Sequence, residues 1–119
     1  MRSLIIVPTY NEIENIQALI EAIFAETPPE VELLVCDDGS PDGTGKLVDS
    51  LREKYPRLHA LHRKGKLGLG SAYIAGFKYA LSNGFDAVIE MDADFSHHPT
   101  YLKTMLAQLQ KNDFVIGSR

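Results

Sequence analysis

The chain has 119 residues, which is enough for one small domain. Its formal net charge is −4, so nothing in the composition indicates non-specific binding to nucleic acid. The single cysteine, Cys36, excludes an internal disulfide, and no apolar run approaches the roughly 20 residues that a membrane-spanning helix needs.

Five short runs rich in Ile, Val and Leu have the pattern of β-strands. Most do not alternate between apolar and polar residues, which is typical of parallel strands buried on both faces. The five predicted strands are Ser3–Val7, Val31–Cys36, Leu58–His62, Asp86–Met91 and Phe114–Ile116.

The first predicted strand is followed by a helix-like stretch with a capping-box pattern. Asn11 is the predicted N-cap, and Glu14 stands three residues later. Pro28 lies beyond the expected end of the helix. The apolar residues recur at helical spacing and predict one buried face, formed by Ile13, Ile16, Leu19, Ile20, Ile23 and Phe24.

Three further helices are predicted between the remaining strands. The second spans about residues 44–55 and the third about 69–82, where Asn83 and Gly84 supply a stop signal. The fourth opens at Pro99, a favoured residue of the first helical turn. Its apolar stripe is Leu102, Met105, Leu106 and Leu109, and that of the second helix is Leu47, Val48 and Leu51.

Strict alternation of strands and helices predicts an α/β fold with a parallel sheet and helices on both faces. Ligands of such sheets bind beyond the carboxyl ends of the strands, where the strand order reverses. With the order 3-2-1-4, this point lies between the first and fourth strands. Pro8–Glu12 and Asp92–Asp94 follow those two strands.

Two carboxylates, Asp92 and Asp94, stand one residue apart directly after the fourth predicted strand. In an extended segment both side chains point the same way, so both can face one ligand. A hard cation such as Mg²⁺ or Mn²⁺ prefers one or two carboxylates together with substrate phosphates. The alternative interpretation is a solvated turn, because Asp is common after strands.

Two more polar segments end at the same predicted sheet edge. In Asp37–Thr44, turn chemistry explains the glycines, and Thr44 is expected to cap the next helix. Turn formation does not explain the adjacent Asp37 and Asp38, one of which could accept hydrogen bonds from a nucleobase. In Pro8–Glu12, Tyr10 could stack on a base or ribose, and Glu12 could accept from a ribose hydroxyl. This convergence of acidic clusters indicates a nucleotide-dependent enzyme.

Other polar residues carry weaker signals. Arg63–Gly70 combines three cations and three glycines before a helix, where backbone amides can bind anions, but a flexible loop is the simpler interpretation. It matches neither the Walker loop nor the dinucleotide fingerprint. His97 and His98 are adjacent and lack a third ligand at zinc spacing, so packing or capping is expected.

Five segments, taken as an ordered set, resemble the family 2 inverting glycosyltransferases. The closest resemblance is to the dolichol-phosphate (polyprenol-phosphate) mannosyltransferases, and it spans the whole chain. The segments are Pro8–Glu12, Asp37–Thr44, Leu67–Tyr73, Met91–Pro99 and Gly117–Arg119.

The resemblance implies a GT-A fold, a Rossmann-like, mostly parallel sheet that binds a nucleotide-diphospho-sugar. Residues 1–119 would be the N-terminal, nucleotide-sugar-binding part of a single such domain, truncated at its C-terminus. The implied reaction transfers mannose from GDP-mannose to a polyprenyl (dolichyl) phosphate with inversion, and it depends on Mg²⁺ or Mn²⁺. An isolated fragment of this length is expected to be inactive or nearly so.

The resemblance also implies roles for individual residues. Asp92 and Asp94 would be the catalytic metal ligands, with Asp94 the main one. Some relatives place a metal-contacting Gln where this chain has Ser96, which leaves that contact without a counterpart. The implied donor-binding residues are Pro8, Tyr10 and Glu12 around the guanosine, Cys36 and Asp38 at its floor, and Asp92, Ala93, Asp94 and Arg119 along the rest of the donor.

The chemistry of the implied reaction is physically consistent. A divalent cation neutralises the charge that develops on the diphosphate leaving group. A phosphate monoester acceptor is largely ionised near neutral pH, since its second pKa is ~6, so no strong general base is assigned. The lipid acceptor implies contact with a membrane surface on the cytoplasmic side, either peripheral or through segments outside this chain.

Three other functions are compatible with parts of the pattern. A family 2 transferase could use a UDP-sugar such as UDP-glucose. A sugar-nucleotide pyrophosphorylase also has acidic metal ligands on an α/β sheet, but it normally carries a Gly-rich basic segment after the first strand, which Pro8–Glu12 is not. A non-catalytic α/β binding module gives no reason for acidic clusters at one sheet edge.

Overall fold

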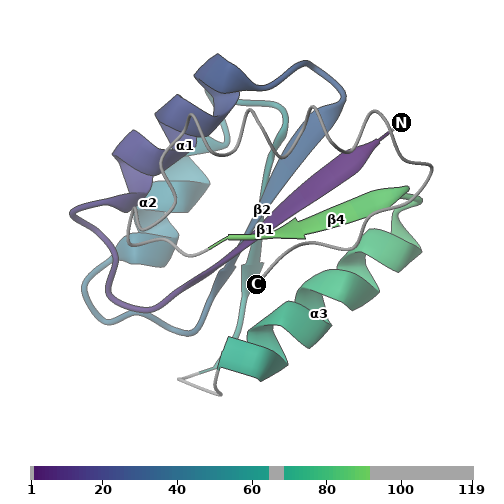
Figure 1. Ribbon diagram of the computed structural model, residues 1–119. Helices are drawn as coiled ribbons and strands as arrows, with labels where there is room; N and C mark the ends of the chain where they lie inside the picture. The colour runs from purple at the N-terminus through teal and green to yellow at the C-terminus, as the bar shows by residue number, and fades with distance from the viewer. Residues whose placement is uncertain (1, 65–68, 92–119) are drawn as a thin grey trace.

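The computed structural model describes residues 2–64 and 69–91, which form alternating strands and helices around one sheet (Figure 1). The predicted fourth helix and fifth strand lie outside the described residues. The elements in chain order are β1 (Ser3–Thr9), α1 (Ile16–Glu26), β2 (Val31–Asp37), α2 (Thr44–Leu51), β3 (Leu58–His62), α3 (Leu69–Ser82) and β4 (Ala87–Glu90).

The four described strands form a parallel sheet in the order β3-β2-β1-β4, which confirms the predicted order. Val7 of β1 pairs with Val35 of β2, and Ile5 of β1 pairs with Ile89 of β4. All four strands therefore end at the same edge of the sheet. The loops that carry the predicted site residues follow β1 and β2 at this edge.

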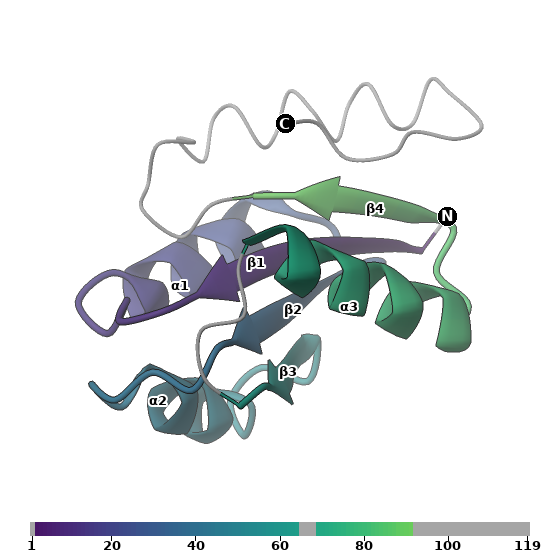
Figure 2. The same ribbon diagram turned by 90° about the horizontal axis from the view of Figure 1, so that it is seen from below.

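Both faces of the sheet are covered, which is why the strands are apolar on both sides. Helices α1 and α2 cover one face and α3 covers the other, as Figures 1 and 2 show. Within β1, Ile5 and Val7 face α1 and α2, whereas Leu4 and Ile6 pack with residues of α3. All four side chains are fully buried.

The predicted cap of the first helix is wrong. Asn11 has a positive φ of 57°, in the left-handed region, and α1 begins five residues later at Ile16. The chain first makes a turn in which the backbone amides of Asn15 and Ile16 both donate to the carbonyl of Glu12. Ile13, expected on the buried face, is 39 % exposed because it belongs to this turn and not to the helix.

The ends of the other helices show how local signals work. Helix α3 spans the predicted residues. Gly84, just beyond the helix, has a φ of 74°, and the amide of Phe85 donates to the carbonyl of Ala80. Together these features form a Schellman motif that ends the helix. Helix α2 ends at Leu51, earlier than predicted, and turns continue to Lys54.

No helix within residues 2–64 and 69–91 is long and apolar enough to cross a bilayer.

Candidate functional site

The candidate site lies at the carboxyl edge of the sheet, where the loops after β1, β2 and β3 meet. Pro8 sits near the end of β1 and is half-buried, and Tyr10 follows it with 37 % of its surface exposed. Glu12 is half-buried in the same loop. The backbone amide of Asp38, after β2, donates to the carbonyl of Thr9, which brings the two loops together.

A buried ion pair joins Asp38 to Arg63, the residue that follows β3. The guanidinium Nε lies 3.2 Å from the Asp38 Oδ1, and the two side chains are only 9 % and 8 % exposed. Nη2 of Arg63 donates to the hydroxyl of Ser71 on α3 at 2.8 Å. Nη1 is buried and has no hydrogen-bond partner among the described residues. A carboxylate and a guanidinium are thus held together at the edge where a base would bind.

Arg63 was missed by the sequence interpretation, which assigned it to a flexible glycine-rich loop. Its backbone amide donates to the carbonyl of Asp37 at 2.8 Å, so Arg63 still belongs to the ordered sheet edge. The sequence did contain a signal for this residue. Arg63 is a cation directly after β3, and the neighbouring strand β2 is followed by the second of the two adjacent acidic residues, Asp37 and Asp38. Residues 65–68 of that loop lie outside the described residues.

The adjacent Asp37 and Asp38 have different partners on opposite faces of the sheet. The carboxylate of Asp37 accepts hydrogen bonds from the hydroxyl of Thr9 at 2.7 Å and from the amide and hydroxyl of Ser40 at 3.0 and 2.6 Å. It also lies close to Gly45 of α2, whereas Asp38 contacts Arg63 on the α3 side. The carboxylate of Asp37 is therefore engaged within its own turn, whereas that of Asp38 is paired with Arg63.

Cys36, predicted at the floor of the pocket, is fully buried. Burial raises the pKa of its thiol to about 12; the charge of Arg63 opposes this rise and that of Asp38 adds to it. The thiol is protonated at neutral pH and packs as a small apolar group. It has no nucleophilic or metal-binding chemistry in this state.

Thr44 does not cap α2 as predicted. It is the first residue of the helix, and the Oδ1 of Asp42 accepts hydrogen bonds from its amide at 2.9 Å and from its hydroxyl at 2.5 Å. Asp42 instead accepts the hydrogen bond of the first helical amide, because the left-handed turn at Gly43, with a φ of 95°, brings the short carboxylate of Asp42 back to the first helical residue.

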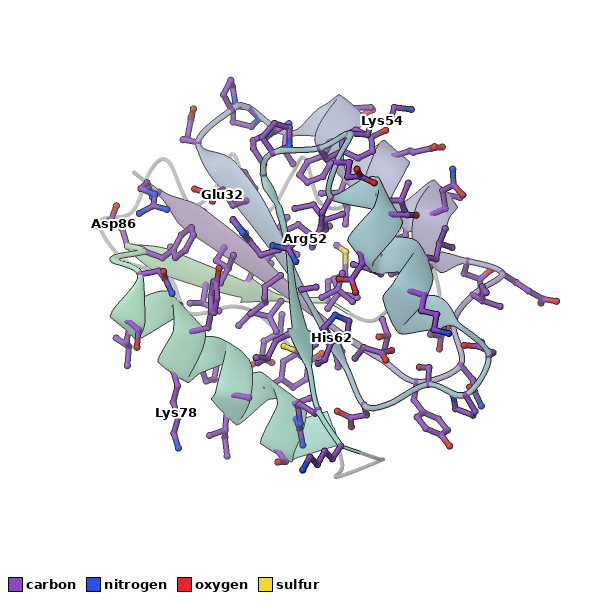
Figure 3. All side chains as sticks on the ribbon, turned by 180° about the vertical axis from the view of Figure 1, so that it is seen from behind. Glu32, Arg52, Lys54, His62, Lys78 and Asp86 are labelled. Carbon is purple, nitrogen blue, oxygen red and sulfur yellow. The ribbon has the colours of Figure 1, made fainter. Side chains whose placement is uncertain are left out.

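A cavity of about 440 Å³ opens beside this loop, on the α2 side of the sheet. Asp37, Ser40, Lys46 and His62 are among its lining residues, and none of the predicted nucleoside-binding residues is. His62, labelled in Figure 3, has its Nε2 2.9 Å from the Oδ1 of Asp49 on α2. This cavity is therefore separate from the Asp38–Arg63 pair.

The predicted metal and diphosphate residues Asp92, Ala93, Asp94 and Arg119 lie outside the described residues, as do Ser96, His97 and His98. Residues 2–64 and 69–91 contain no group of three His, Cys, Asp or Glu side chains that could hold a metal ion. The amide of Met91, the last described residue before Asp92, donates to the carbonyl of Ile6 at 3.0 Å. The chain thus leaves β4 beside β1, the neighbour predicted from the strand order.

A parallel sheet with helices on both faces and polar loops gathered at its carboxyl edge is typical of the doubly wound α/β folds, whose ligands bind beyond that edge. Residues 4–119 match the family described as Glycosyl transferase family 2. The chain belongs to this family of glycosyltransferases, and its fold is GT-A.

Two curated relatives match the chain along its whole length. Undecaprenyl-phosphate mannosyltransferase from Micrococcus luteus is 49 % identical over 100 % of this chain and 49 % of its own length. Polyprenol monophosphomannose synthase from Mycolicibacterium smegmatis is 48 % identical over 99 % of this chain and 45 % of its own length. The chain therefore spans about half the length of the curated relatives it matches.

Among solved structures, the chain is similar to the mannosyltransferase PcManGT from Pyrobaculum calidifontis, in complex with GDP-Man and Mn²⁺. The TM-score is 0.71 at 30 % sequence identity, and the match covers 78 % of this chain and 27 % of that one.

Proposed function

We propose that this chain is the donor-binding part of a polyprenyl-phosphate mannosyltransferase that uses GDP-mannose. The observation that carries the proposal is the near-50 % identity, along the whole chain, to two relatives named for mannose transfer to polyprenyl phosphates. The GDP-Man and Mn²⁺ in the PcManGT structure support the choice of donor and metal. The product would have inverted configuration at the anomeric carbon.

The nucleoside end of the donor would lie over the carboxyl edge of β1 to β3. Tyr10, which is partly exposed, would stack on the base or ribose, and Glu12 would accept from a ribose hydroxyl. Asp38 would accept hydrogen bonds from N–H groups of the base, with Pro8 and the backbone around Cys36 completing the pocket. A guanine also offers a carbonyl oxygen, and the unpartnered, buried Nη1 of Arg63 is a donor suited to that acceptor.

Asp92 and Asp94 would hold Mg²⁺ or Mn²⁺, with Ala93 beside the donor and Arg119 at its diphosphate. Two carboxylates plus phosphate oxygens are the donor set that these cations prefer. When bound, the metal would supply charge neutralisation for the leaving diphosphate. The acceptor phosphate is already largely ionised at neutral pH, so the proposal needs no strong general base.

The lipid acceptor places the reaction at a membrane surface, on the cytoplasmic side where nucleotide sugars are available. Contact through the lipid and through segments beyond this chain would suffice for this location. The partners are then a nucleotide sugar and a polyprenyl phosphate, with no role for nucleic acid.

The function is tested with the complete protein in a thermal-shift panel of GDP, UDP and GTP, each with and without Mn²⁺. A ligand that binds only the folded state raises its stability by mass action, by about 2.7 kcal/mol at 100 times Kd. We expect GDP with Mn²⁺ to give the largest shift and Asp94→Asn to lose the Mn²⁺-dependent part. An assay with GDP-mannose and a polyprenyl phosphate should then yield polyprenyl-phosphate mannose and GDP.

Each alternative has its own signature in this panel. Preference for UDP would be consistent with a family 2 transferase but would mean that the sugar donor is a UDP-sugar and not GDP-mannose. Preference for GTP would favour a pyrophosphorylase, and no response to any nucleotide would contradict the proposal in favour of a binding module.

A further inference from the structure

Three consecutive backbone amides of the β1–α1 loop donate to two side chains of the β2–α2 loop and to that of the first residue of α2. The amide of Asn11 donates to the hydroxyl of Ser40 at 2.9 Å, and that of Glu12 to the hydroxyl of Thr44 at 3.0 Å. The amide of Ile13 donates to the Oδ2 of Asp42 at 3.2 Å. We call this set of hydrogen bonds the loop clasp. It holds the segment in which Tyr10 and Glu12 lie.

The two hydroxyls of the clasp are oriented as acceptors by neighbouring carboxylates. Ser40 donates its proton to Asp37 at 2.6 Å, and Thr44 donates its proton to Asp42 at 2.5 Å. Each hydroxyl oxygen therefore directs lone pairs toward the amide that it accepts from. Hydrogen bonds that involve an ionised group are shorter and stronger than neutral ones.

Asp42 is ionised at neutral pH and so remains an acceptor. Desolvation raises its pKa, but hydrogen bonds from the hydroxyl and amide of Thr44 and from the amide of Ile13 outweigh this effect and hold the pKa below its ordinary value of 3.8. Thr44, which is fully buried, links this carboxylate to the amide of Glu12. The acceptors of the clasp are thus held by hydrogen bonds within their own segment.

The β1–α1 loop, whose backbone amides are the hydrogen-bond donors of the clasp, is supported by these acceptors. Asn11 has a φ of 57°, a left-handed conformation that few residues other than glycine adopt, although asparagine tolerates it better than most. Asn11 and Ile13 are exposed, so burial of these two side chains contributes little to fixing their backbone. The clasp fixes the backbone of Asn11, Glu12 and Ile13, and so contributes to the positions of Tyr10 and Glu12.

We propose that Ser40, Asp42 and Thr44 are positioning residues for the nucleoside, acting through the β1–α1 loop without contacting the ligand themselves. The proposal rests on the proposed function, which assigns Tyr10 and Glu12 to the nucleoside pocket. Preorganisation of this loop lowers the entropic cost of binding, so breaking the clasp weakens donor binding.

The test compares Thr44→Val with Thr44→Ser in the complete protein. Valine keeps the shape of threonine but removes the acceptor for Glu12, whereas serine keeps the hydroxyl. We expect Thr44→Val to raise the KM for the nucleotide sugar and the Kd for the nucleoside diphosphate about tenfold, with kcat at saturating donor changed less than twofold. Thr44→Ser should restore both constants to within about twofold of wild type.

Thr27→Val is the matched control. The hydroxyl of Thr27 donates to the carbonyl of Ile23 at the far end of α1, at 2.8 Å, and does not contact the clasp. Its loss should leave KM and Kd unchanged. Ser40→Ala removes a single bond of the clasp at a half-buried residue and provides a second variant if Thr44→Val folds poorly. We expect it to raise Kd about threefold.

A double-mutant cycle separates positioning from general loss of structure. If Thr44 acts through Tyr10 and Glu12, Thr44→Val should change Kd less than twofold in a Tyr10→Ala, Glu12→Ala background. Full additivity, or an unchanged Kd in Thr44→Val and Ser40→Ala, would overturn the positioning role alone. A wild-type protein that binds no nucleoside diphosphate would overturn the proposed function, and the positioning role with it.

Discussion

Glu32 of β2 connects His59 of β3 with Arg2, the residue before β1, at the amino edge of the sheet, opposite the candidate site. Its Oε2 lies 2.9 Å from Nη2 of Arg2, and its Oε1 lies 2.6 Å from Nε2 of His59. Desolvation raises the pKa of Glu32, but hydrogen bonds from His59 and Arg2 together with their charges outweigh it and hold the pKa below its ordinary value of 4.5. We expect a network of this kind, at the opposite edge of the sheet from the candidate site, to serve stability.

We expect Glu32→Gln to lower the free energy of unfolding at neutral pH by about 1 kcal/mol, since it removes a partly buried, hydrogen-bonded charge. Because the folded-state pKa lies below the unfolded value, this stabilisation is fully present above pH 4.5 and is lost as the pH falls through the folded-state pKa. Urea unfolding of variant and wild type at several pH values measures the difference.

The control for Glu32 is Glu30→Gln, which makes the same change of net charge at an exposed residue nearby. It should alter stability little at any pH. A Glu32→Gln difference that persisted unchanged well below pH 4.5 would mean that the substitution acts through packing and not through the charge.

At the scale of elements, the contact between α3 and β1 depends on a glycine. A Cβ added at Gly76 would lie 2.7 Å from both Cδ1 and Cγ2 of Ile6, which is fully buried. Helix α3 therefore lies closer to the sheet than any side chain at this position would allow. This contact sets the distance between α3 and β1.

Gly76→Ala should destabilise the fold by about 1–2 kcal/mol, because overpacking costs roughly 1–3 kcal/mol and the gain in helix propensity of up to about 1 kcal/mol offsets only part of it. Gly70 provides the matched control in the same helix, since a Cβ there meets no heavy atom within 4 Å. Gly70→Ala should be neutral or stabilising. Thermal unfolding of both variants measures the contrast, and equal effects would contradict the close contact at Gly76.

At the scale of the whole molecule, the chain spans about half the length of its curated relatives and carries the donor side of the proposed reaction. We expect the 119-residue chain alone to bind GDP with Mn²⁺ but to transfer mannose at less than about a hundredth of the rate of the complete protein, because misplaced or missing groups at the acceptor side cost factors of this size. Calorimetry and a radiolabelled transfer assay test the two parts separately. Transfer by the 119-residue chain at a rate comparable to that of the complete protein would contradict this expectation.

Local patterns in the sequence were sufficient for the architecture. Apolar runs such as Leu4–Val7 indicated strands buried on both faces, and their alternation with helices indicated a parallel sheet. The order β3-β2-β1-β4 was assumed as a common order of such folds, and it is the order observed. The stop signal at Gly84 also acted locally, because few residues other than glycine adopt its left-handed conformation. The same reasoning brought Tyr10, Glu12 and Asp38 to one edge, since parallel strands all end there.

Only the tertiary structure decided how the site residues are paired. The capping pattern at Asn11 was misleading because Ser40, Thr44 and Asp42, about 30 residues away, provide stronger partners for the loop amides than a local cap does. Arg63 likewise gained its role from Asp38 on the neighbouring strand. Periodicity and local propensity act over a few residues. Hydrogen bonds and ion pairs between loops depend instead on which strand ends the fold places next to one another.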